Sequence, residues 1–180
     1  MSTQTKRTLV GLVIMTLCFG GGPAMASTPV EAKNGMVAAA HPLASQVGVE
    51  ILKKGGNAVD AAVATAFALG VVEPNASGLG GGGFILVYNA RTKGVTAIDY
   101  REMAPLKATP DMYKLTPDGK VVDKENEMGH KAVAIPGTLA GLTMALKQHG
   151  TMSLKEVMAP AIRIAEEGYT VSKTLNAMMK

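Results

Sequence analysis

The segment Ala58–Val72 constrains the fold most strongly, because it carries apolar side chains around the whole circumference of a helix. It reads AVDAAVATAFALGVV, and Asp60 is its only charged residue. Asn57 is a favourable N-cap, and Asp60 lies where an acidic side chain complements the helix dipole. Glu73-Pro74 then ends the helix. A helix without a polar face is buried, so we predict that this one lies inside the protein, with a neighbouring layer close to its alanines.

Periodicity and helix-ending residues predict several shorter elements on both sides of this helix. Before it, we expect a buried strand over residues 36–40 and a helix from Pro42 to the stop signal Lys53-Lys54-Gly55-Gly56. After it, we expect a hairpin with strands over residues 84–88 and 95–100, and then an irregular segment over residues 106–130. A short strand over residues 133–135 and helices that begin after Gly137, Ser153 and Ser172 complete the chain. Ser153 and Glu156 form the S-x-x-E pattern of a capping box.

Residues 1–26 have the organisation of a signal peptide. Lys6 and Arg7 form a basic region, residues 8–19 are apolar, and Ala24-Met25-Ala26 supplies the small-x-small pattern of a cleavage site. We therefore expect an exported protein, periplasmic or secreted, whose mature form comprises residues 27–180; a short membrane anchor is the alternative. No apolar run reaches the roughly 20 residues of a membrane-spanning helix, so we expect no membrane partner for the mature form.

Composition excludes several partners and sites for the mature part. The formal net charge of +4 comes without a cluster of lysines and arginines, so no nucleic-acid partner is expected. The single cysteine, Cys18, lies in the predicted leader, and His41, His130 and His149 are far apart in the sequence. We therefore expect no disulfide, no metal site and no cofactor.

The glycine-rich run of residues 78–83, GLGGGG, formally matches the G-x-G-x-x-G pattern of dinucleotide-binding loops. Such a loop follows a strand and opens a helix, whereas here a predicted helix precedes the glycines and a predicted strand follows them. No lysine follows Gly83, and Asn75 stands where a G-x-S-x-G nucleophile elbow would need its first glycine. We interpret the glycines as positions of close backbone packing.

Arg101 is the residue that we single out as a candidate for binding. It lies at the end of a predicted strand, beside Glu102, where a side chain can point into a site. A guanidinium group holds a carboxylate through two parallel hydrogen bonds, a geometry that lysine does not offer. A structural ion pair of Arg101 with Glu102 or Asp99 is the alternative, and the residue pattern by itself leaves both open.

Three segments together resemble the γ-glutamyltranspeptidase family. They read VVEPNASGLGGGGF (residues 71–84), DYREMAP (residues 99–105) and AIPGTLAGL (residues 134–142). The preceding AAAHPLASQVGVEILKKGGNAVDAAVA (residues 38–64) is similar to the N-terminal region of that family. The likeness covers essentially everything after the predicted leader, in one order and without large gaps.

The resemblance implies a fold, a reaction and a role for two residues. Members of the family are N-terminal nucleophile (Ntn) hydrolases with an α+β fold, an αββα sandwich, made as an exported precursor that cleaves itself into a large and a small subunit. The new N-terminal threonine of the small subunit attacks the γ-glutamyl amide of glutathione, and water or an amino acid then takes the γ-glutamyl group. Arg101 matches the arginine that binds the substrate's α-carboxylate. Glu102 matches the neighbouring acid and is the second substrate-binding candidate that the resemblance implies, after Arg101.

The chain departs from the family in its length. It resembles only the N-terminal part of the large subunit, and no threonine in it is followed by threonine or histidine, as the start of the small subunit requires. We therefore expect the nucleophilic threonine beyond Lys180, no catalytic residue within the chain, and an inactive fragment that needs the C-terminal region as its partner. A related Ntn-type amidase or acylase fragment is one alternative, and a non-catalytic exported binding module is another.

Overall fold

The computed structural model describes residues 29–180 of the chain. The predicted signal peptide, residues 1–26, and its cleavage site lie outside the described residues. Contacts divide the chain into two units, Met1–Lys33 and Asn34–Lys180, and all elements named below belong to the second unit. Within the described part, no helix is long and apolar enough to cross a membrane.

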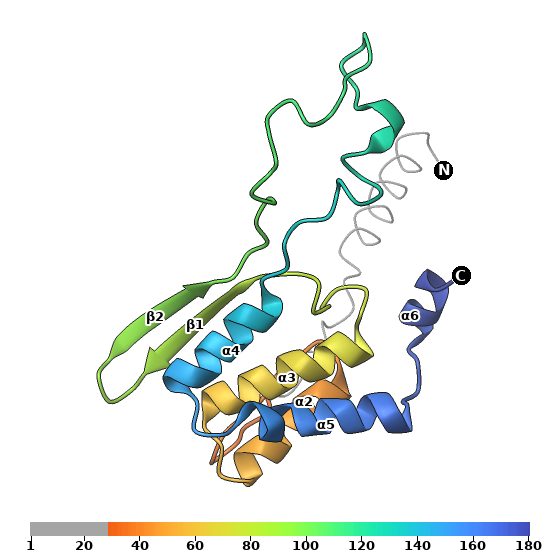
Figure 1. Cartoon of the computed structure of the whole chain (residues 1–180). Coiled ribbons are helices and arrows are strands. Elements are labelled where there is room, and N and C mark those ends of the chain that lie inside the picture. The colour runs from red at the N-terminus through yellow and green to blue at the C-terminus, as the bar shows by residue number, and fades with distance from the viewer. Residues whose placement is uncertain (1–28) are drawn as a thin grey trace, which may run out of the picture. The chain divides into compact units, whose positions relative to one another are not determined.

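Helix α3 (Ala58–Val72) is the central helix of this unit, as its apolar sequence predicts (Figure 1). It contacts three other helices, which are α2 (Pro42–Lys53), α4 (Thr138–His149) and α5 (Leu154–Glu167). Their buried side chains form one hydrophobic core, whose members include Ile51, Phe67, Leu142 and Val157. The burial of α3 on several sides is what its sequence requires, because an apolar surface in contact with water is unfavourable.

The predicted helix starts are confirmed. Asn57 and Ser153 each form a capping box, at the starts of α3 and α5 respectively. The Ser172 side chain accepts a hydrogen bond from the N–H of Leu175 and caps the short helix α6 (Lys173–Met178). Helix α2 ends before Gly55, whose φ of +94° is a conformation that glycine adopts without steric cost.

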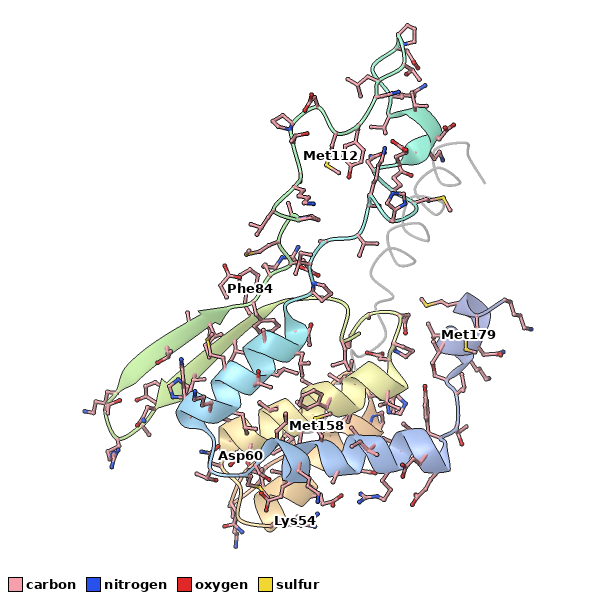
Figure 2. All side chains as sticks on the ribbon, viewed as in Figure 1. Lys54, Asp60, Phe84, Met112, Met158 and Met179 are labelled. Carbon is pink, nitrogen blue, oxygen red and sulfur yellow. The ribbon has the colours of Figure 1, made fainter. Side chains whose placement is uncertain are left out.

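Asp60 links the start of α3 to the connection between α4 and α5 (Figure 2). Its carboxylate is fully buried and accepts hydrogen bonds from the Thr151 hydroxyl at 2.6 Å and from the N–H groups of Asn57, Thr151 and Met152 at 2.8 to 3.1 Å. Burial raises the pKa of Asp60, but these hydrogen bonds outweigh it and lower the pKa below its ordinary value. The residue therefore joins two segments of backbone, the start of α3 and the α4–α5 connection, through one ionised carboxylate.

The only sheet in the described residues is an antiparallel hairpin of β1 (Phe84–Asn89) and β2 (Gly94–Asp99), as the sequence predicts. One face of the hairpin lies against α4 and buries Ile98, with Ile85 half-buried beside it. The opposite face exposes Phe84, Leu86 and Tyr88. The sheet therefore has one covered face and one apolar face open to solvent.

Two predicted strands are wrong as stated. Residues 36–40 form no strand, because no neighbouring strand in the described part supplies a hydrogen-bonding partner for their backbone. Val37 and Ala39 still pack against the core, whereas Met36 is exposed. Residues 133–135 form only an isolated bridge between Ile135 and Met103. The irregular segment predicted over residues 106–130 is confirmed, apart from a short 3-10 helix, η1 (Val122–Lys124).

Candidate functional site

Three segments that are distant in the sequence meet at one end of the hairpin, where β1 begins, β2 ends and α4 begins (Figure 1). The carbonyl of Gly81, in the glycine-rich run, accepts hydrogen bonds from the N–H groups of Gly137 and Thr138 at 2.9 and 3.0 Å. The N–H of Tyr100 donates to the carbonyl of Gly83 at 3.0 Å. The run of residues 78–83 is thereby fixed between the end of β2 and the start of α4.

Arg101 lies two residues after the end of β2 and keeps most of its side chain in solvent. The side chain is 60% exposed, and one guanidinium nitrogen, Nη1, lies 3.3 Å from Oε2 of Glu102. The Asp99 carboxylate accepts a hydrogen bond from the backbone N–H of Arg101 at 2.9 Å, and so fixes the backbone just after β2. In the described part of the chain no other group pairs with the guanidinium, which leaves it free to bind an anion.

Glu102 turns its carboxylate inward, against the glycine-rich run. Its side chain is 25% exposed, and Oε2 is buried without a hydrogen bond from any described residue. A Cβ atom on Gly82 would lie 2.9 Å from this oxygen, and one on Gly81 would lie 3.5 Å from Oε1. The carboxylate therefore lies in contact with glycine backbone, and its ion pair with Arg101 holds the guanidinium from one side.

A cavity of about 250 Å³ lies beside Arg101, between β2 and α4. Apolar side chains form most of its wall, among them Met103, Ile135 and Met144. Three larger hollows lie elsewhere: one of about 490 Å³ near the hairpin turn, one of about 810 Å³ between α3 and residues 34–39, and one of about 530 Å³ along α4. None of them is lined by Arg101 or Glu102. The wall of the smaller cavity holds two charged residues, Asp99 and Arg101, and of these Arg101 is the one that can pair with a free carboxylate.

Two other titratable side chains near the helix ends have structural roles. Glu50 bridges Lys54 and Arg163, at 2.7 and 2.8 Å, and joins α2 to α5. His41 caps α2 by accepting the N–H of Leu43. Among residues 29–180, no group of three histidine, aspartate or glutamate side chains lies close enough together to hold a metal ion.

The structure brings the two predicted site residues, Arg101 and Glu102, together. It is compatible with both interpretations of Arg101, as a carboxylate-binding residue and as a partner in a structural ion pair. The ion pair with Glu102 forms, whereas Asp99 contacts the backbone and not the guanidinium. Sequence patterns did not single out Tyr100 or the two glycines at the start of α4, Gly137 and Gly141, that pack closely on Tyr100. Gly137 and Gly141 are four residues apart and so share one face of a helix, which is the signal that could have indicated a close approach there.

Comparison with known proteins identifies one family. Residues 44–180 match the family described as gamma-glutamyltranspeptidase. The chain is 54% identical over 144 residues to a glutathione hydrolase proenzyme of Bacillus subtilis, covering 79% of this chain and 24% of that protein. It is 48% identical over 153 residues to the acylase ACY 1 proenzyme of a Pseudomonas species, covering 82% of this chain and 27% of that protein. The chain spans about a quarter of the length of these relatives.

Solved structures agree with the sequence comparison. The crystal structure of Helicobacter pylori γ-glutamyltranspeptidase is similar with a TM-score of 0.78 and 45% sequence identity. The superposition covers 84% of this chain and 43% of that one. The arrangement of helices and hairpin described above is therefore also present in a larger protein of known structure.

Proposed function

Because the chain belongs to the γ-glutamyltranspeptidase family, we propose that it supplies the carboxylate-binding part of an enzyme acting on glutathione or related γ-glutamyl compounds. The enzyme moves the γ-glutamyl group to water or to an amino acid. The observation that carries the proposal is the Arg101 side chain, 60% exposed at the end of β2 and held by a single ion pair. A guanidinium in this position grips the α-carboxylate of the substrate through two hydrogen bonds.

Arg101 acts on a part of the substrate that is remote from the bond being broken. A threonine hydroxyl attacks the γ-carbonyl carbon, the amine leaves with the hydroxyl proton, and water or an amino group then cleaves the resulting ester. The α-carboxylate keeps its charge throughout, so its contact with Arg101 serves to hold and orient the γ-carbonyl. Glu102 keeps the guanidinium in place through the 3.3 Å ion pair.

The nucleophile of this reaction comes from outside the 180 residues. No threonine of the chain is followed by threonine or histidine, which is the pattern that the family resemblance requires. A carboxylate clamp supplies binding only, because acyl transfer also needs an activated nucleophile and donors for the oxyanion. By itself the chain is inactive, and the region that completes the enzyme is its partner.

An acylase is the second candidate, and the 48% identity to the Pseudomonas acylase proenzyme favours it specifically. An arginine clamp holds any substrate whose free carboxylate lies at the right distance from the scissile amide. A γ-glutamyl group differs from a glutaryl group only by its α-amino group. The two candidates therefore predict different responses to the loss of that amino group.

A chimera distinguishes these possibilities. In it, this chain replaces the matching 144 residues of the Bacillus subtilis glutathione hydrolase proenzyme, which supplies the rest of the enzyme. Three anilides serve as substrates: the γ-glutamyl anilide, the 4-aminobutyryl anilide, which lacks only the α-carboxylate, and the glutaryl anilide, which lacks only the α-amino group. We expect turnover of the γ-glutamyl anilide far above that of both others. Preference for the glutaryl anilide would favour the acylase, and equal use of the 4-aminobutyryl anilide would contradict a carboxylate clamp.

The protein is exported, with cleavage after Ala26, and acts in the periplasm or outside the cell. The basic residues Lys6 and Arg7, the apolar residues 8–19 and the small residues before Ser27 support this proposal.

A further inference from the structure

Two glycines at the start of α4 leave no room for a side chain, because the backbone of Tyr100 and Arg101 lies against Gly137 and the Tyr100 side chain lies against Gly141. A Cβ atom on Gly141 would overlap Cβ, Cγ and Cδ1 of Tyr100. A Cβ atom on Gly137 would overlap the carbonyl oxygen of Tyr100 and lie 3.2 Å from that of Arg101. Both contacts thus involve the residue before Arg101 and, for Gly137, Arg101 itself.

These overlaps cannot be relieved by a side-chain rotation. Cβ of Tyr100 is fixed by the backbone, and the Tyr100 carbonyl is backbone that accepts the N–H of Gly83 at 3.4 Å. Gly137 has a φ of −109°, which alanine also adopts, and Gly141 lies within the helix, where alanine is the more favourable residue. The backbone conformation at these two positions therefore does not require glycine. Glycine is required because the residues that follow β2 approach the start of α4 closely.

The glycine-rich run makes a third contact of the same kind. A Cβ atom on Gly82 would lie 2.5 Å from the Tyr100 carbonyl oxygen, 2.7 Å from the Glu102 nitrogen and 2.9 Å from Oε2 of Glu102. Gly82 therefore contacts the backbone on both sides of Arg101, and also the carboxylate that pairs with its guanidinium at 3.3 Å.

We propose that Gly82, Gly137 and Gly141 are positioning residues for Arg101: they allow the backbone of residues 100–102 to lie against the start of α4, which places the guanidinium for the substrate carboxylate. This inference rests on the proposed function, and it adds three glycines that set the position of the Arg101 guanidinium. A side chain at any of these glycines shifts the backbone of residues 100–102, and the guanidinium moves with it. A misplacement of about 1 Å can cost about 100-fold in rate.

The test uses the chimera with the Bacillus subtilis protein and measures one ratio. This ratio is kcat/KM for the γ-glutamyl anilide divided by kcat/KM for the 4-aminobutyryl anilide. It reports recognition of the α-carboxylate, and a general loss of folded enzyme does not change it, because both substrates lose turnover equally. We expect Gly141→Ala to lower the ratio by about 10- to 100-fold, mainly through a higher KM for the γ-glutamyl anilide. Gly82 lies outside any helix, so Gly82→Ala provides the same test if Gly141→Ala does not fold.

Gly48→Ala is the matched control. Gly48 lies in α2, away from Arg101, and a Cβ atom there would overlap Oγ1 of Thr65 and lie 2.7 Å from Cγ1 of Val37. This variant should lower the melting temperature and leave the ratio unchanged. The inference is overturned if the glycine variants keep the ratio of the unsubstituted chimera while Arg101→Lys lowers it. If Arg101→Lys itself leaves the ratio unchanged, the proposed clamp is wrong and the inference falls with it.

Discussion

At Arg101 a charged side chain is left open to solvent, whereas at Asp60 a charged side chain is enclosed on every side. Arg101 is 60% exposed and has one ion pair, at 3.3 Å. Asp60 is fully buried, and both of its carboxylate oxygens accept hydrogen bonds. A buried carboxylate with a shifted pKa often indicates a catalytic site, but a carboxylate whose oxygens are all occupied has none free to act as a base. We therefore assign Asp60 to stability and Arg101 to binding.

Replacing Asp60 tests this assignment through stability. In Asp60→Asn the side-chain amide puts an N–H donor in the place of one carboxylate oxygen, against groups that are themselves donors, so the hydrogen bonds to that oxygen are lost. We expect a loss of about 2 kcal/mol or more in the free energy of unfolding at neutral pH, measured by urea denaturation of the chimera. Glu166→Gln, at an exposed carboxylate near the end of α5, is the control and should change little.

The difference between the wild-type and Asp60→Asn chimeras should depend on pH. The folded state lowers the pKa of Asp60, so unfolded Asp60 takes up a proton at higher pH than folded Asp60 does. The stabilisation is fully present above the ordinary aspartate pKa of about 3.9 and is lost as the pH falls through the lowered pKa of the folded state. A difference in melting temperature that stays constant from neutral pH down through this range would show that the ionised carboxylate contributes nothing.

At the scale of elements, the sequence predicts those features that depend on neighbours in the chain. The helices α3 and α5 begin at their predicted caps, α2 begins at its predicted first residue, Pro42, and the hairpin differs from its predicted bounds by about one residue. Residues 36–40 lack a strand partner, and pairing between distant segments is not encoded by local propensity. The spacing of Gly137 and Gly141 could have indicated a close approach, but the residue that approaches Gly141, Tyr100, is far away in the sequence, so the local pattern does not identify it.

The two faces of the hairpin give a prediction with a matched control. Leu86 is 75% exposed on the open face, whereas its neighbour Ile85 packs against the core on the covered face. In the 180-residue chain we expect Leu86→Ser to increase the soluble yield without changing the helical circular dichroism, because it removes exposed apolar surface. Ile85→Ser should instead decrease the soluble yield, since it places a hydroxyl against the core. A gain in yield from Ile85→Ser would mean that the covered face is assigned wrongly.

At the scale of the whole molecule, the family and the fold class predicted from the motifs are confirmed by the family match and by the likeness to solved γ-glutamyltranspeptidase structures. Motifs in register identify a family even where single elements are misplaced. The roles of Arg101 and Glu102, the leader and the inactivity of the chain remain predictions. They depend on a substrate, a peptidase and a nucleophile, whose contacts with this chain no local sequence pattern describes.

The inactivity of the chain can be measured directly. We expect the purified 180-residue chain to release no aniline from the γ-glutamyl anilide above a heat-treated control, because it lacks the N-terminal threonine nucleophile. Turnover that follows the chain through purification would mean that a catalytic group within these residues has been overlooked.

Export predicts a defined N-terminus. Protein recovered from the periplasm or the medium should begin at Ser27, after the Ala24-Met25-Ala26 site. N-terminal sequencing checks this, and exported protein that keeps residues 8–19 would favour the membrane-anchor alternative.

The central claim is that Arg101 recognises the α-carboxylate of a γ-glutamyl substrate, and Arg101→Lys in the chimera tests it most directly. Lysine keeps the positive charge and loses the two-pronged geometry. Losing one partner of a desolvated charge pair costs about 2–5 kcal/mol, so kcat/KM for the γ-glutamyl anilide should fall by roughly 30- to several-thousand-fold, mainly through KM. The 4-aminobutyryl anilide should be turned over as before. If the variant instead melts at a lower temperature and binds both anilides normally, Arg101 is only a structural partner of Glu102.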